Sequence, residues 1–155
     1  MKEAAFTAAA ERHLDMVYRV ALNWFRSPAD AEDAAQTTML KLWQTDTEFA
    51  DDEHLRRWLV RVTLNVCKDM SRSPWRRHTV SLEELPEPAF SDEERRTVYR
   101  EVMALPGKYR VPLYLYYYEG YSVSEIGELL RLNVSTVQTR LARARGKLKI
   151  ELTEV

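Results

Sequence analysis

The sequence predicts an all-α protein of two small helical domains joined by a flexible linker, and three observations indicate this fold class. The 155 residues include only four glycines, and no short apolar runs are separated by turn dipeptides, so a β-sheet is not expected. Apolar residues recur at three- and four-residue steps in several long segments, as on amphipathic helices. Residues 73–91 contain three prolines, no sustained period and an acidic end, which is typical of a linker.

The first domain, expected over residues 1–72, should contain three helices. The first carries one apolar stripe between Phe6 and Phe25. The second begins at "SPAD", where Ser27 is a suitable N-cap and Pro28 a suitable first helical residue, and it should run to about Gln44. Its predicted apolar face consists of Ala35, Met39, Leu42 and Trp43. After an acidic loop, the third helix has its apolar stripe between Leu55 and Met70.

The second domain, expected over residues 92–155, ends in a helix-turn-helix pattern. A helix through Met103, a break at "LPG" and a tyrosine-rich helix near residues 109–118 come first. "SVSE" then has the capping-box spacing of Ser122 and Glu125 and starts a short helix over residues 123–130. "STVQ" repeats the capping pattern at Ser135, which predicts a last helix reaching about Leu152. Two helices separated by a four-residue turn have the spacing of a helix-turn-helix.

The last helix has two distinct faces. Val137, Leu141, Ala144 and Leu148 form an apolar stripe that should pack inward, while Thr136, Arg140, Arg143 and Lys147 fall on the other side. A solvated basic face would normally have acidic partners one turn away. Residues 131–150 contain six Lys/Arg and no acid, so contact with DNA phosphates is favoured over a merely solvated face.

Composition excludes several other classes of protein. The formal net charge is only −1, but acidic and basic blocks alternate along the chain, which indicates separate surfaces for differently charged partners. A single cysteine excludes an internal disulfide, and no apolar run approaches the roughly 18 residues of a membrane span, so a cytoplasmic location without membrane insertion is expected. No metal-ligand spacing, glycine-rich phosphate loop or nucleophile motif occurs, so neither a cofactor nor an enzymatic activity is predicted.

Three segments together carry a family resemblance. "DAEDAAQTTMLKLW" is similar to a polymerase-docking helix, "RRWLVRVTLNVCKDMSR" to a promoter-melting helix, and "ALPGKYRVPLYLYYYEGYSVSEIGELLRLNVSTVQTRLARARGKL" to a domain that reads a promoter −35 element. In this order and spacing the chain resembles an extracytoplasmic-function (ECF) sigma factor of the bacterial sigma-70 family. The resemblance implies a dissociable promoter-specificity subunit that binds core RNA polymerase and promoter DNA, both duplex and single-stranded. It also implies an anti-sigma factor as a further partner.

The resemblance assigns residues to three surfaces. Core polymerase binding would use Asp33, Gln36, Leu40 and Trp43. Contact with the opened −10 strand would use Arg57, Arg61, Asn65, Lys68, Asp69 and Arg72, with Asn65 and Asp69 near a flipped-out base and the loop around residues 49–54 completing the pocket. Recognition of the −35 element would use Ser135, Thr136, Gln138, Thr139, Arg140 and Arg143, and Lys147 adds a cation for phosphate.

Departures from the family pattern leave alternatives open. Thr37 and Gln138 stand where an acid and a cation are usual, and Arg131 replaces a common turn glycine, so the turn would either avoid positive φ or differ in shape. Leu40 and Trp43 could instead belong to the core, and Asn65 could simply face solvent. The resemblance implies that the acidic linker threads the positively charged polymerase channel used by RNA, but the linker could also be a plain tether. Two alternative functions remain open. The chain could be a stand-alone helix-turn-helix repressor or activator, or a helical adaptor that binds only protein.

Overall fold

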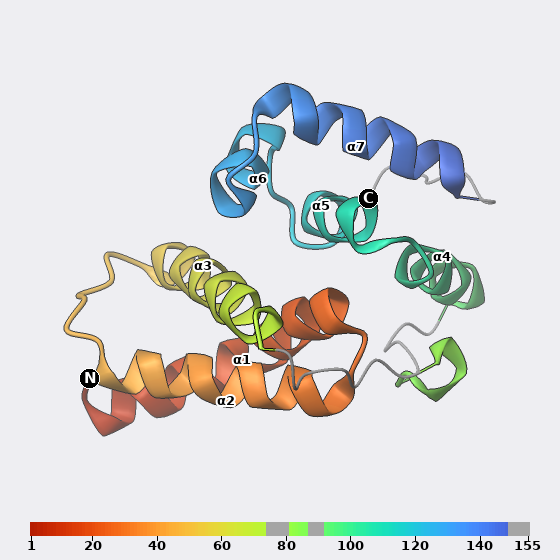
Figure 1. Cartoon of the computed structure of the whole chain (residues 1–155). Helices are drawn as coiled ribbons and strands as arrows, with labels where there is room; N and C mark the ends of the chain where they lie inside the picture. The colour runs from red at the N-terminus through yellow and green to blue at the C-terminus, as the bar shows by residue number, and fades with distance from the viewer. Residues whose placement is uncertain (74–80, 87–91, 149–155) are drawn as a thin grey trace. The chain divides into compact units, whose positions relative to one another are not determined.

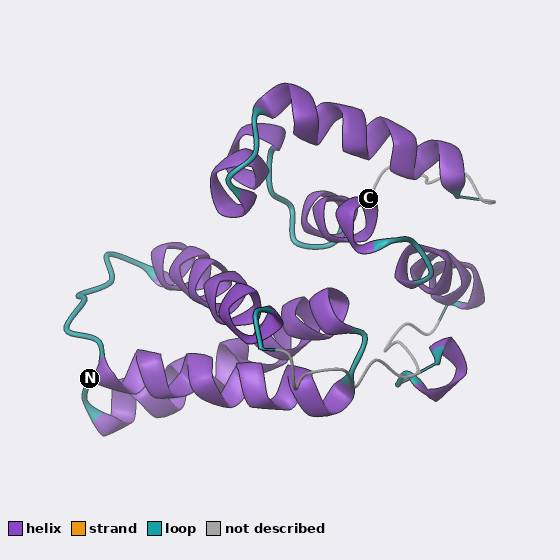
Figure 2. Cartoon of the chain, in the orientation of Figure 1, coloured by secondary structure: helices purple, strands orange, loops and turns teal. Residues whose placement is uncertain are grey.

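The computed structural model describes residues 1–73, 81–86 and 92–148, and every regular element in these ranges is helical (Figure 1, Figure 2). The chain divides into two compact units, residues 1–79 and 80–155. The all-α prediction is therefore confirmed. Most of the predicted linker, residues 73–91, lies outside the described residues, and the predicted domain boundaries remain a prediction. No helix within the described ranges is both long and apolar enough to cross a membrane.

The first unit is a three-helix arrangement of α1 (Glu3–Phe25), α2 (Pro28–Gln44) and α3 (Asp52–Ser71). As predicted, α2 is capped by Ser27, whose side chain accepts a hydrogen bond from the Asp30 backbone N–H at 3.2 Å. The shared core takes residues from all three helices, including the fully buried Val17, Leu42 and Leu59. Each helix buries one stripe, so the polar faces of α2 and α3 are left for other contacts.

One member of the predicted apolar face of α2 does not belong to the core. Ala35, Met39 and Leu42 are buried, but the Trp43 side chain is 44% exposed. Its ring packs edge-on against Phe6 of α1, with the ring centroids 5.3 Å apart, at the margin of the unit. The apolar pattern of α2 does not by itself separate core from surface, because a bulky residue next to the stripe can satisfy the pattern without entering the core.

An ion-pair cluster joins the start of α3 to α1. Asp52 Oδ1 lies 2.7 Å from Arg12 Nη1 and 2.9 Å from Nε2 of the buried His13. Hydrogen bonds from Arg12 and then His13 hold the pKa of Asp52 below its ordinary value of 3.8. Because a lowered carboxyl pKa favours the folded state, Asp52 stabilises the unit above its unfolded-state pKa and ceases to do so as the pH falls through its native pKa.

We therefore expect Asp52→Asn to lower the free energy of unfolding of the first unit at pH 7, with a deficit that shrinks as the pH falls below 3.8. Urea titrations followed by tryptophan fluorescence measure this directly, because all four tryptophans lie within residues 1–79. Asp51→Asn is the control, since asparagine caps a helix as well as aspartate. A deficit of constant size from pH 7 to pH 3 would contradict the ion-pair explanation.

The second unit contains the 3-10 turn η1 (Leu82–Glu84), α4 (Glu93–Met103), α5 (Gly107–Tyr117), α6 (Val123–Leu130) and α7 (Val134–Lys147). Helix α5 packs against α4, α6 and α7 and so forms the centre of this unit. Its Leu113, Tyr114 and Leu115 are at most 2% exposed, and Ile126 of α6 and Leu141 of α7 meet them in the core. The short α6 and long α7 are thus oriented by burial against α5.

The helix-turn-helix forms, but its second helix begins earlier than predicted. The capping box of Ser122 and Glu125 is present, with hydrogen bonds of 3.0 and 3.1 Å. The N-cap of α7 is Asn133, not Ser135, and its carbonyl accepts from the Val137 N–H. Two acceptable capping residues stand two positions apart, and the turn brings the chain into helical geometry at the first. The helix ends at Lys147, because Leu148 is extended, and residues 149–155 lie outside the described part.

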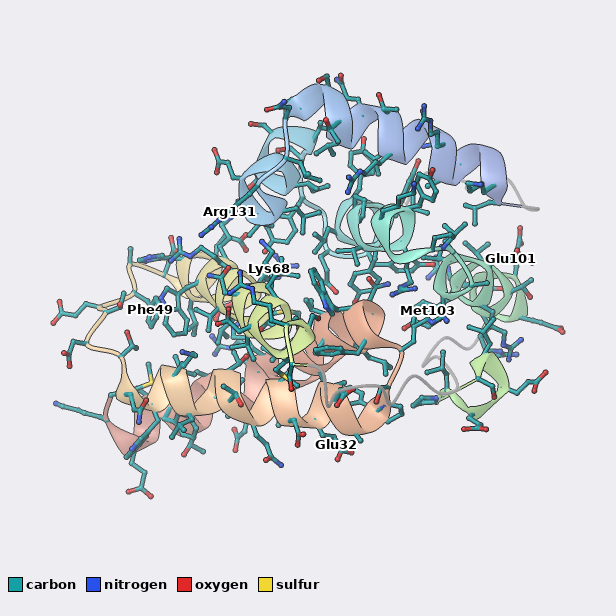
Figure 3. All side chains as sticks on the ribbon, viewed as in Figure 1. Glu32, Phe49, Lys68, Glu101, Met103 and Arg131 are labelled. Atoms are coloured by element: carbon teal, nitrogen blue, oxygen red, sulfur yellow. The ribbon has the colours of Figure 1, made fainter. Side chains whose placement is uncertain are left out.

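The turn between α6 and α7 is set by Arg131 and Gly127. Arg131 (Figure 3) has φ of 58°, so the alternative in which this turn avoids positive φ is wrong. Its backbone N–H and that of Leu132 both donate to the Gly127 carbonyl, which closes the end of α6. The chain returns so closely that a Cβ on Gly127 would lie 2.8 Å from the Leu132 carbonyl oxygen.

Arg131→Gly is expected to stabilise the second unit by about 0.5–1 kcal/mol. The left-handed conformation costs a non-glycine residue about 1–2 kcal/mol, and the added flexibility of glycine in the unfolded chain offsets part of the gain. Thermal unfolding followed by far-UV circular dichroism checks the direction. Arg131→Ala, which keeps the backbone strain, is the matched control and should bring no comparable gain.

Candidate nucleic-acid and polymerase interfaces

Helix α7 presents the predicted polar and basic face to the outside. Val137, Leu141 and Ala144 are buried, which leaves the opposite side of the helix free. All seven residues predicted for −35 contact are exposed or half-buried: Ser135, Thr136, Gln138, Thr139, Arg140, Arg143 and Lys147. Five side chains of α7 line one side of a groove of about 320 Å³, with short polar groups near the start of the helix and arginines further along. This order suits contact with base edges near the start of the helix and contact with phosphates further along it.

The other side of the α7 groove is formed by residues that the sequence analysis missed. Lys108 and Tyr109, in the first turn of α5, line the groove together with Arg140 and Arg143. Lys108 belongs to no periodic charge pattern, and Tyr109 is one of several tyrosines in the same helix. The local sequence therefore does not mark either residue as part of a binding surface. Only the packing of α5 against α7 brings them to this groove.

The tyrosines of α5 hold other cations of α7. Arg145 Nε donates a 2.8 Å hydrogen bond to the Tyr117 hydroxyl, and its guanidinium lies 5.7 Å from the Tyr116 ring centroid. The deeply buried Tyr114 hydrogen-bonds to Glu119 instead. The tyrosines are therefore core and rim residues, and Arg145 is more engaged within the unit than Arg140.

Helix α3 carries the face predicted to hold the −10 strand. The helical period places six residues on this side of the helix. Lys68 is half-buried, and the others are exposed: Arg57, Arg61, Asn65, Asp69 and Arg72. Some of this charge is balanced locally. Glu53 Oε1 lies 2.9 Å from Arg57 Nε, and Asp69 Oδ1 lies 3.1 Å from Arg72 Nη1. Arg61 has no acidic partner among residues 1–73, so it is the more available cation beside Asn65.

The loop before α3 is ordered by aromatic contacts. The half-buried Phe49 (Figure 3) packs edge-on against Trp58, with centroids 5.5 Å apart, and against His54 at 5.2 Å. The Ala50 N–H donates to His54 Nδ1 at 3.0 Å, and the His54 N–H donates to the Asp51 carboxylate. These contacts fix the loop against the first turns of α3, next to the basic face.

Helix α2 presents an apolar ridge among polar residues. Leu40 is 55% exposed and Trp43 is 44% exposed, so neither is a core residue, and this alternative is wrong. Together with Phe6 and Gln36 they line a shallow depression of about 560 Å³ on α1 and α2. Asp33 is exposed one turn before Gln36. Large apolar side chains at a polar surface are typical of a protein–protein interface.

Cys67 is a core residue rather than part of a site. Cys67 is fully buried in α3, and burial raises the pKa of its thiol to about 12, which suits a core residue. Within residues 1–73, 81–86 and 92–148 no group of three His, Cys, Asp or Glu side chains could hold a metal ion.

Comparisons with known proteins agree with the two-unit architecture. The Sigma-70 region 2 family matches residues 9–77 and the Sigma-70 region 4 family matches residues 95–148. The ECF RNA polymerase sigma factor SigM of Mycobacterium tuberculosis is 31% identical over 147 residues, covering 93% of this chain and 75% of SigM. The ECF RNA polymerase sigma factor SigW of Bacillus subtilis is 27% identical, covering 97% of this chain and 90% of SigW.

Solved structures show the same fold. The sigma factor RpoE of Bartonella quintana, solved with the anti-sigma factor NepR, matches with a TM-score of 0.73 at 19% identity over 94% of both chains. CnrH, solved with the cytosolic domain of CnrY, matches with a TM-score of 0.63 at 27% identity over 94% of this chain and 86% of CnrH. The chain belongs to the ECF sigma factors of the bacterial sigma-70 family.

Proposed function

We propose that this chain binds core RNA polymerase through α2 and directs it to promoters by gripping the −35 duplex with α7 and the opened −10 strand with α3. The observation that carries this proposal is the occurrence, in one chain, of two basic helical faces and an exposed apolar ridge with Leu40 at 55% exposure. A stand-alone helix-turn-helix regulator would need α7, but it would need neither the exposed apolar ridge nor a second basic face. The polymerase supplies the chemistry, and the cytoplasm, where it works, is the proposed location.

The residue assignments follow from exposure and chemistry. The ridge of Leu40 and Trp43, flanked by Asp33 and Gln36, would dock on the polymerase. On α7, Gln138 offers an amide that can pair with adenine, while Arg140 and Arg143 are suited to guanine or phosphate. On α3, Arg61 would follow the backbone of the open strand and Asn65 would contact a base edge.

Regulation by a protein that covers these faces is part of the proposal. RpoE was solved with the anti-sigma factor NepR and CnrH with the cytosolic domain of CnrY. By analogy, an anti-sigma factor would bind this chain and keep α2 or α7 from their targets. Its expected signature is loss of polymerase binding by the full chain when the partner is present.

Run-off transcription from a promoter library, with core polymerase in the presence or absence of this chain, tests the function. We expect promoter-dependent transcripts only when the chain is present. Tight duplex binding without any transcript would support a stand-alone regulator instead, and no binding to DNA or polymerase would support an adaptor.

Two variants test the site map in the same assay. Arg143→Ala is expected to reduce −35-dependent initiation by about 5- to 150-fold, the equivalent of about 1–3 kcal/mol for a lost groove contact. Asn65→Ala should shift the preferred −10 sequence and leave −35 dependence intact. Arg95→Ala, an exposed cation on α4, is the control. If both test variants transcribe like the parent, these residue assignments are wrong, and the family membership of the chain is unaffected.

A further inference from the structure

The first turn of α5 and the outer face of α7 meet in a cluster of positive charge. Lys108 Nζ lies 5.1 Å from the ring centroid of Tyr109, and Lys147 Nζ lies 5.4 Å from the same centroid. Arg143 lines the same groove as Tyr109 and, like the two lysines, lowers the pKa of its phenol. One tyrosine ring thus gathers three cations from two helices that are far apart in the sequence.

Tyr109 is well placed to organise this cluster. The residue is 8% exposed, so its ring is fixed by the packing of α5 against α7. Burial by itself raises the pKa of its phenol, but Lys108, Arg143 and Lys147 outweigh this effect and the pKa is lowered below 10.0. The lowered pKa reports a positive potential around the hydroxyl.

No carboxylate balances the three cations within the described part of the chain. None of the three cations has an acidic partner among residues 81–86 and 92–148. On α3, by contrast, Arg57 and Arg72 each pair with a carboxylate. Like charges gathered without a counter-charge repel one another, and a bound anion relieves that repulsion. The cluster borders the groove that α7 presents to DNA, and the anion available there is a backbone phosphate.

We propose that Lys108, held by Tyr109 beside Arg143 and Lys147, binds a backbone phosphate of the duplex that α7 reads, so that the DNA-contacting surface extends from the recognition helix to the start of α5. This inference rests on the proposed function of α7 and adds a contact outside the helix-turn-helix. The α5 helix begins at Gly107, so the positive end of its dipole reinforces the same site. Since a phosphate contact positions the protein without reading bases, Lys108 should contribute equally on every sequence.

The salt dependence of duplex binding by the full chain tests the proposal. The probe is a fluorescent pool of 20-base-pair duplexes of random sequence, titrated by anisotropy between about 20 and 150 mM KCl, where phosphate contacts dominate. Lys108→Gln is expected to weaken binding several-fold and to reduce the slope of log K against log [salt] by about 0.9, the loss of one phosphate contact. Lys108→Arg should restore the slope.

Arg95→Gln is the matched control, because it removes one exposed cation from the same unit and leaves the cluster intact. Thermal unfolding of each variant shows that the unit remains folded. The proposal is overturned if Lys108→Gln and Arg95→Gln change the slope equally, or if the parent chain binds no duplex at the lowest salt. The proposed function is tested separately by transcription with core polymerase, and it is overturned if the parent chain yields no transcript.

Discussion

Leu40→Asp is expected to weaken binding of the chain to core RNA polymerase by at least about 100-fold, the equivalent of about 3 kcal/mol, and to abolish transcription. The exposed leucine is the centre of the ridge on α2. Its replacement removes an apolar contact with the polymerase, and the new carboxylate would be desolvated on binding. Because Leu40 contributes nothing to the core of the unit, the variant should still fold. Binding to labelled core polymerase in solution measures the effect.

Lys41→Asp provides the control for this experiment. It places the same carboxylate on the same turn of α2, but about 100° around the helix from Leu40. Lys41 is exposed and does not line the depression on α1 and α2, so polymerase binding should be almost unchanged. Equal losses from both variants would show that added negative charge, not the ridge, explains the result. Undiminished binding of Leu40→Asp would place the polymerase contact elsewhere.

Gly127→Ala should destabilise the second unit by about 2 kcal/mol and lower its Tm by roughly 8–16 °C. A Cβ at this position would lie 2.8 Å from the Leu132 carbonyl oxygen, a backbone atom that cannot rotate away. The turn into α7 would have to open, and the hydrogen bond from the Leu132 N–H to the Gly127 carbonyl would be strained. Duplex binding should fall together with stability.

The placement of aromatic residues separates this effect from changes in the first unit. Tryptophan fluorescence reports residues 1–79, whereas far-UV circular dichroism follows the helices of both units. Gly127→Ala should shift the part of the circular-dichroism transition that belongs to the second unit and leave the tryptophan-fluorescence transition unchanged. Gly146→Ala makes the same substitution in α7, where a Cβ would meet nothing within 4 Å, and should be neutral or slightly stabilising. Similar Tm values for the two variants would rule out the close approach at Gly127 as the cause.

Local capping signals predicted several element boundaries well. Ser27 and Pro28 start α2, and Ser122 with Glu125 starts α6, because a side-chain cap acts within one turn and needs no tertiary context. The start of α7 was misplaced because Asn133 and Ser135 both make acceptable caps, and the path of the turn decides between them. The conformation of Arg131 was also beyond local signals, since burial of the two flanking helices imposes its positive φ.

The candidate surfaces could be predicted where one helix carries the whole pattern. The period of α7 places Thr136, Arg140 and Arg143 away from the core, and the structure agrees. The exposure of Trp43 could not be read from α2 alone, because the helix bears apolar residues on more than one side and only the packing of α1 and α3 selects those that are buried. Lys108 was not predicted, since its proposed role depends on contact between α5 and α7.

Because Cys67 is buried, the protein can be labelled selectively at introduced surface cysteines. Its thiol is inside α3 and has a pKa of about 12, so it should not compete with an introduced surface cysteine for maleimide dyes. Cysteines at the exposed Gln44 and Glu128 would place one dye on each unit while the native residue stays in the core. Energy transfer between such dyes would then follow the separation of the two units as the chain passes from solution onto the polymerase.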